Sequence, residues 1–185
     1  MAIYAARREL VMTTPYFVPE EALLTAMLSA AGRGVEVTLV VPASVDSRLV
    51  RLASQAHKGE LIAAGVRVVQ FDGGLLHTKS ITVDGEFSLF GSLNLDPRSL
   101  FLNFEITLCV YDRKFTSELR KMQQGYIDQS QEMDLQQWRS RSGPVKLAEN
   151  TARLLSSRQC SGCTLAGADL SQMDLSGVDL HGADL

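Results

Sequence analysis

Short apolar segments alternate with amphipathic helical segments along the first half of the chain, and this alternation limits the possible folds more than any other feature. The segments 10–17, 35–42 and 66–71 are short and apolar, and the last two are rich in β-branched residues, which is typical of buried strands. The segments 19–32 and 47–64 between them carry helical patterns that end at glycines. Strands joined by helical crossovers pair in parallel. The alternation therefore predicts an α/β fold with a mixed, mainly parallel sheet flanked by helices.

The second half continues with strands and then with helices. Segments 77–83 and 86–90 are expected to form a hairpin across Asp84-Gly85, because this dipeptide favours a tight turn. Segment 104–111 is expected to be a further strand, with Cys109 in its core-facing phase. Helices are expected at 115–127 and 144–157.

Composition changes near residue 158, where leucine begins to recur every five residues. The chance of five leucines in phase is on the order of 10⁻⁵ at ordinary leucine frequency. A small or apolar residue stands two positions before each leucine. The two sets are Leu165, Leu170, Leu175, Leu180 and Leu185, and Cys163, Ala168, Met173, Val178 and Ala183. A period of five fits neither a helix nor a flat strand, so it predicts a repeat solenoid.

This tail resembles the pentapeptide-repeat family. The resemblance implies a right-handed β-solenoid of about one coil, with the leucines and the small residues pointing inward. Cys160 and Cys163 fall in the two inward phases, so both are expected in the repeat core. A zinc site is disfavoured because one Cys-x-x-Cys supplies only two of four ligands.

The net charge of −3, from 18 basic and 21 acidic residues, counts against nucleic acid as the main partner. It also gives no general attraction to an anionic membrane surface. No segment approaches the roughly 20 apolar residues of a spanning helix, and residues 1–10 lack the apolar core of a signal peptide.

The residues that carry chemistry follow a fixed order. His77 and Lys79 stand two apart, Asp84 follows, and then comes Gly91-Ser92-Leu93-Asn94. On a strand, residues two apart share one face about 7 Å from each other, so His77 and Lys79 could hold one phosphate between them. Ser92 and Asn94 add neutral donors, which completes a site for phosphoryl transfer.

A histidine nucleophile needs a second group that orients its ring. Glu105 is the best candidate, because it is an acid within an otherwise apolar segment. Asp84 lies at the hairpin turn, where a structural role is also open.

These residues resemble the HKD signature of the phospholipase D superfamily. Segments 14–19, 92–99 and 102–105 are further similar to the C-terminal catalytic half of bacterial cardiolipin synthases, and the similarity runs from about residue 3 to residue 157. The resemblance implies a phosphatidyltransferase that acts on a phosphatidylglycerol-like phospholipid through a phosphohistidine intermediate, without a metal or other cofactor. It also implies the membrane surface as a partner and the cytoplasmic side of the bacterial inner membrane as the location.

The resemblance also assigns roles to individual residues. His77 would be the nucleophile or its general-acid partner, and Lys79, Ser92 and Asn94 would bind the phosphate. Glu105 would support His77, and Asp84 would be the third residue of the catalytic motif.

Cardiolipin synthases carry two HKD motifs, whereas this chain has one, because neither His57 nor His181 belongs to a second motif. Since one histidine attacks and another protonates the leaving oxygen, a second HKD half is expected, from a homodimer or from a missing N-terminal half. Two alternatives stay open: a homodimeric phosphodiesterase or nuclease, and an inactive truncated half whose tail mediates interactions. The expected domains are 1–143 (HKD domain), 144–158 (helix or linker) and 159–185 (pentapeptide repeats).

Overall fold

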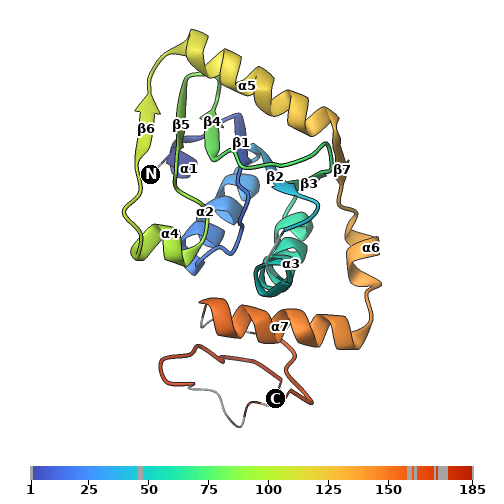
Figure 1. Cartoon of the computed structure of the whole chain (residues 1–185). Coiled ribbons are helices and arrows are strands. Elements are labelled where there is room, and N and C mark those ends of the chain that lie inside the picture. Colours follow the sequence, from blue (N-terminus) through green and yellow to red (C-terminus); the bar gives the residue numbers. More distant parts are fainter. Residues whose placement is uncertain are drawn as a thin grey trace.

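One mixed β-sheet with helices on both faces forms the body of the molecule (Figure 1). The structure is a computed structural model, and it describes residues 2–45, 48–157, 160, 162–168, 170 and 175–184. The described residues form a seven-stranded sheet with the order β6-β5-β4-β1-β2-β3-β7. The strands are β1 (Glu9–Thr13), β2 (Glu36–Pro42), β3 (Arg67–Phe71), β4 (Ser80–Val83), β5 (Phe87–Gly91), β6 (Thr107–Val110) and β7 (Ser130–Glu132).

The pairing of strands divides the sheet into two parts. β1 pairs with β2 and β2 with β3 in parallel, as the helical crossovers predicted. Within the described part of the chain, the other four pairings are antiparallel, so the parallel part is smaller than expected. The carboxyl ends of β1, β2 and β3, the start of β4 and the end of β5 all lie at the same edge, and β6 begins there.

The helices cover the two faces of the sheet and bury alternate residues of its strands. Figure 1 shows α5 over one face and α2 and α3 on the other. Leu10 and Met12 of β1 lie in the core with α2 and α3, whereas Val11 lies in the core under α5. The helices are α1 (Ala2–Ala5), α2 (Glu21–Gly32), α3 (Arg48–Ala63), α4 (Pro97–Phe101), α5 (Arg113–Asp128), α6 (Leu135–Arg139) and α7 (Gly143–Ser157).

Several expectations are confirmed and others are wrong in detail. The hairpin turn forms at Asp84-Gly85, where both residues have positive φ (54° and 69°), as a primed turn requires. The strand expected from residue 77 begins only at Ser80, because residues 75–79 form an irregular crossing segment. The strand expected over 104–111 shortens to β6, and Cys109 is exposed rather than buried. The short elements α1, α4, α6 and β7 were not predicted.

The repeat segment closes on itself over about four pentads. The amides of Cys160, Gly162 and Leu165 donate to the carbonyls of Asp179, His181 and Asp184, each 19 residues further along. Apart from Ala183, the expected inward residues that the structure describes cluster with Leu154 of α7. Cys160 and Cys163 within this cluster are joined by a disulfide that the sequence did not predict. Met173 and Leu185 lie outside the described residues. The right-handed sense of the solenoid stays a prediction.

The helices that the structure describes include none that is both long and apolar enough to cross a bilayer.

Candidate active site

Three neighbouring chain segments meet at the end of the sheet where the parallel strands have their carboxyl ends, and they carry most of the expected site residues. The amide of Gly91 donates to the carbonyl of Lys79 (3.2 Å), and the amide of Ser92 donates to the carbonyl of Ile106 (2.9 Å). Adjacent strands lie about 4.8 Å apart. Lys79, Ser92 and Glu105 are therefore neighbours because of strand register, although 26 residues separate the first from the last.

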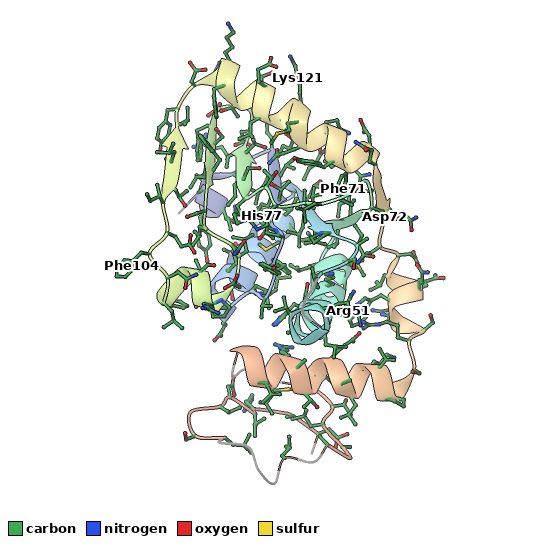
Figure 2. All side chains as sticks on the ribbon, in the orientation of Figure 1. Arg51, Phe71, Asp72, His77, Phe104 and Lys121 are labelled. Atoms are coloured by element: carbon green, nitrogen blue, oxygen red, sulfur yellow. A yellow bond between two sulfur atoms is a disulfide. The ribbon has the colours of Figure 1, made fainter. Side chains whose placement is uncertain are left out.

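His77 and Lys79 lie against each other just before β4. Lys79 Nζ is 3.2 Å from Nδ1 and 3.4 Å from Nε2 of His77, and it donates to the His77 carbonyl at 2.9 Å. His77 is exposed, and Figure 2 shows it near the middle of the view. An exposed imidazole and a cation thus share one open position, and their roles in binding and attacking a phosphate stay predictions.

The charge of Lys79 is set by burial and by two acids. Burial lowers the pKa of the Lys79 ammonium, whereas the nearby carboxylates of Glu105 and Asp96 raise it. The site therefore combines one cation with two acids before any phosphate is bound. A phosphate that binds at Lys79 must compete with this acidic surrounding, so neutral donors are needed as well.

Ser92 and Glu105 form the second pair of the site. The Ser92 hydroxyl donates to Glu105 Oε2 and accepts from the amide of Ile106 at 3.0 Å. Asn103 Nδ2 donates to the other carboxylate oxygen at 3.0 Å. The hydrogen bonds from Ser92 and Asn103 hold the pKa of the Glu105 carboxyl below its usual range. Glu105 is thus a fixed anion that orients Ser92.

The structure does not join Glu105 directly to His77 by a hydrogen bond between described atoms. The expected support of the nucleophile by Glu105 therefore stays a prediction, and its present contacts are to Ser92 and Asn103. Asn103 was not predicted as a residue of the site. Its signal was available, because it is a second polar residue in the segment 102–105 that ends with Glu105.

Asn94 is held beside the short helix α4. Its Nδ2 donates to Ser99 Oγ at 3.3 Å, whereas its Oδ1 is buried without a partner among the described residues. Asp96 caps α4 by accepting from the amide of Ser99 at 2.8 Å. The neighbouring Leu95 bridges to Phe17, which brings the turn after β1 to the same edge. Asn94 therefore lies in the site region, and its side-chain nitrogen already donates one hydrogen bond.

Asp84 lies at the other end of β4, five residues beyond Lys79, or about 16 Å along an extended chain. Its carboxylate accepts three backbone hydrogen bonds, from Arg7 (2.9 Å), Arg8 (2.8 Å) and Glu9 (2.9 Å). This placement favours a structural role for Asp84, in which it holds the chain at the start of β1. The catalytic assignment of Asp84 loses support, because the structure brings it near none of the other site residues.

The other two histidines are far from this arrangement in the fold. His57 is fully buried in α3, where burial and the nearby Arg153 lower its pKa to about 3. His181 is exposed in the repeat segment. Among the residues that the structure describes, no group of three His, Cys, Asp or Glu side chains could hold a metal ion. The expectation of a metal-free reaction stays a prediction.

Gly91 allows β6 to approach the site, and its replacement gives a testable prediction. A Cβ atom at this position would lie 2.0 Å from the carbonyl oxygen of Ile106. We expect Gly91→Ala to lower the free energy of unfolding by about 3 kcal/mol and to separate Ser92 from Glu105. Thermal or denaturant unfolding measures the first effect.

The matched control for this prediction is Gly125→Ala in α5, where a Cβ atom would meet nothing within 4 Å. The control should stabilise the protein by about 0.5–1 kcal/mol, because alanine favours a helix over glycine. A Gly91→Ala variant as stable as the original protein would contradict the close approach of β6.

Comparison with known proteins gives two family matches. Residues 1–126 match the family described as cardiolipin synthase, PLD-like domain, and residues 159–185 match pentapeptide repeats. Cardiolipin synthase A of Erwinia tasmaniensis is 56% identical over 148 residues, which is 80% of this chain and 30% of that protein. Cardiolipin synthase A of Proteus mirabilis is 56% identical over 140 residues (76% and 29%). The chain thus spans less than a third of the length of these relatives.

Solved structures share the fold at low sequence identity. Nuc, a phospholipase D family member from Salmonella typhimurium, superposes with a TM-score of 0.63 at 20% identity, covering 71% of this chain and 86% of that one. Phosphatidylserine synthase from Haemophilus influenzae Rd KW20 superposes with a TM-score of 0.65 at 19% identity, covering 83% and 41%. The predicted fold of a phospholipase-D-like half is thereby confirmed.

Proposed function

This chain belongs to the cardiolipin synthase, PLD-like domain family, and from that premise we propose that His77 serves phosphatidyl transfer between a phospholipid and an alcohol. The observation that carries the proposal is the pairing of His77 with Lys79 beside Ser92 at one edge of the sheet. A nucleophile, a fixed cation and neutral donors are the groups that phosphoryl transfer requires. The identity to proteins named cardiolipin synthase A supports a phosphatidylglycerol-like donor.

The proposed reaction has two steps. A ring nitrogen of His77 attacks the phosphorus of the donor, the bond from phosphorus to the leaving alcohol breaks, and a second histidine gives that alcohol its proton. The acceptor alcohol then attacks the phosphohistidine, gives its proton to the second histidine and regenerates His77. Lys79 and Asn94 bind the phosphoryl oxygens, and Ser92 joins them by turning its hydroxyl proton from Glu105 to the phosphate. Glu105 acts through Ser92, which it holds in place until the phosphate binds.

The second histidine is proposed to come from another HKD half, either a second copy or a missing N-terminal half. An exposed apolar stretch next to the site supports this partner. We call it the β6 strip, and it consists of Phe101, Leu102, Phe104, Ile106, Leu108 and Tyr111. Phe104 is fully exposed, and Figure 2 shows it pointing away from the body of the molecule. Contiguous apolar groups on an edge strand are typical of a surface that is covered in an assembly.

The location at the cytoplasmic side of a bacterial inner membrane is part of the same proposal. It rests on the similarity to bacterial cardiolipin synthases, and the phospholipid substrate adds only that the site works at a membrane surface.

The test is transfer of the labelled phosphatidyl group of phosphatidylglycerol in mixed micelles, with the oligomeric state measured on the same sample. We expect turnover from a dimer, or from the chain supplemented with the N-terminal half of a relative. Cleavage of a labelled oligonucleotide by the same sample, without lipid turnover, would favour the phosphodiesterase alternative. Absence of both activities from a folded assembly of two halves would contradict the proposal and leave the interaction role.

A further inference from the structure

A group of polar side chains away from His77 lines a hollow at the same end of the sheet, where the parallel strands have their carboxyl ends. The walls of this hollow include Pro15 after β1 and Val41 and Pro42 at the end of β2. Its polar lining consists of Arg51, Ser54, Gln55, Lys58 and Gln70, from α3 and β3. Ligands of α/β proteins bind outside the carboxyl ends of parallel strands. The hollow is therefore placed where such a fold builds a binding site.

The five polar side chains of the hollow have no hydrogen-bonding partner among the side chains that the structure describes. None of them forms a side-chain hydrogen bond or an ion pair within 4.0 Å with another residue that the structure describes. Lys58 is 97% buried, and Ser54 is also buried. The Lys58 ammonium itself keeps some contact with solvent, because its Nζ is not among the fully enclosed, unpaired polar atoms of the described residues. A largely buried lysine whose ammonium opens into a hollow therefore points to a ligand.

The charges around Lys58 do not balance. Arg141 and Glu149 form a close ion pair at 2.5 Å behind it, and this pair has no net charge. Lys58 is attracted by Glu149 and repelled by Arg141, so two cations share one carboxylate. Burial lowers the pKa of the Lys58 ammonium to about 8, which still leaves it mainly charged at neutral pH. A buried charge without a counter-charge is unfavourable, and an anion in the hollow would supply one.

We propose that Lys58 and Arg51, with the neutral donors of Ser54, Gln55 and Gln70, bind the oxyanion of a phosphate group at a site separate from His77. Two cations and several neutral donors suit the tetrahedral oxygens of phosphate. Lys79 immediately precedes β4, and β2 lies two strands away from β4 and β3 lies three strands away. Because neighbouring strands are about 4.8 Å apart, the two sites are about 10–15 Å apart. The segment 13–17 runs between the two sites. Thr13 lines a small hollow beside Lys79, whereas Pro15 lines the hollow beside Lys58.

The experiment is a titration of the full chain with inorganic phosphate, followed by the amide resonances of the labelled protein. The original protein should show two sets of shifted amides, one around Lys79 and Gly91 and one around Ala43 and Gln70. Lys58→Met should weaken the second set at least tenfold and leave the first unchanged. Lys79→Met should do the reverse. Because the readout is binding, a failure of phosphatidyl transfer would leave this result intact.

Two further variants keep the test decisive. Arg51→Met changes an exposed side chain that supports no fold contact, and it should weaken the second set about threefold to tenfold even where Lys58→Met fails to fold. Lys121→Met, on α5 and paired with Glu118, is the matched control and should change neither set. An unshifted second set in the original protein would overturn the proposal. Unaltered binding at that set in both Lys58→Met and Arg51→Met would overturn it as well.

The source of the phosphate group is tested with bicelles that contain phosphatidylglycerol or only phosphatidylcholine. Displacement of inorganic phosphate from the second set by phosphatidylglycerol would identify a lipid head group as the ligand. Binding of inorganic phosphate that neither bicelle displaces would identify a soluble phosphate compound.

Discussion

A His77→Ala variant is expected to lose phosphatidyl transfer by at least about 10⁴-fold, because removal of a nucleophile leaves only binding and charge stabilisation. The exposed imidazole has its nearest charged contact in Lys79, and the described residues of the site contain no other histidine that could take its place. The fold should not change, since the side chain is exposed and lies outside the strands. The measurement is the rate of transfer from labelled phosphatidylglycerol, in the assembly that shows turnover.

The matched control is His181→Ala, which also removes an exposed histidine but does so in the repeat segment. It should keep the original rate. A second readout is the trapping of labelled phosphohistidine after acid-free quenching, which should be seen in the control and be missing in His77→Ala. Turnover that survives in His77→Ala would contradict the nucleophile assignment. It would not affect the proposed second phosphate site, which is read by binding.

An Asp84→Ala variant is expected to lose about 2–3 kcal/mol of stability, because its carboxylate binds three backbone amides at the start of β1. The left-handed backbone of this residue (φ 54°) adds to the loss, since alanine tolerates it less well than aspartate. Denaturant unfolding at neutral pH measures the effect. Asp84→Asn, which tolerates the same backbone and keeps one acceptor oxygen, should lose about half as much.

The effect of Asp84 should also depend on pH. Burial alone would raise its pKa, but the amides of Glu9, Arg8 and Arg7 and the charge of Arg8 together lower it. A carboxyl with a lowered pKa in the folded state stabilises the protein above the pKa of the unfolded state. The difference between the original protein and Asp84→Ala should be constant above about pH 5 and shrink as the pH falls below about 4. A difference that grows towards acid pH would contradict this assignment.

Asp84 also illustrates what a motif in a sequence can and cannot reveal. Its spacing from His77 and Lys79 matches the HKD signature, and the dipeptide that it forms with Gly85 predicted the hairpin turn correctly. The same spacing places it at the far end of β4 from the two other motif residues. A sequence motif shows which residues occur at fixed spacings along the chain. Their distance in space depends on the secondary structure between them, and here an extended strand keeps Asp84 away from His77 and Lys79.

The strand β6 shows the opposite case. Its apolar residues, with Cys109 among them, read as a core strand in the sequence, and the structure exposes both faces. The pattern of apolar residues predicts that a surface will be covered but does not say by which chain. In the described residues nothing covers it, and this exposure supports the second HKD half that the two-histidine reaction requires.

The sequence by itself determined the strand–helix alternation, the hairpin at Asp84-Gly85, the inward phases of the pentads and the neighbourhood of His77 and Lys79, because each depends on residues close together in the chain. Only the tertiary structure decided which strands are antiparallel, that Glu105 contacts Ser92 and Asn103, and that Lys58 lies buried beside Glu149. Strand register and helix packing bring together residues that are far apart in the sequence. Their contacts follow from burial and hydrogen bonding across the whole domain, which no local pattern encodes.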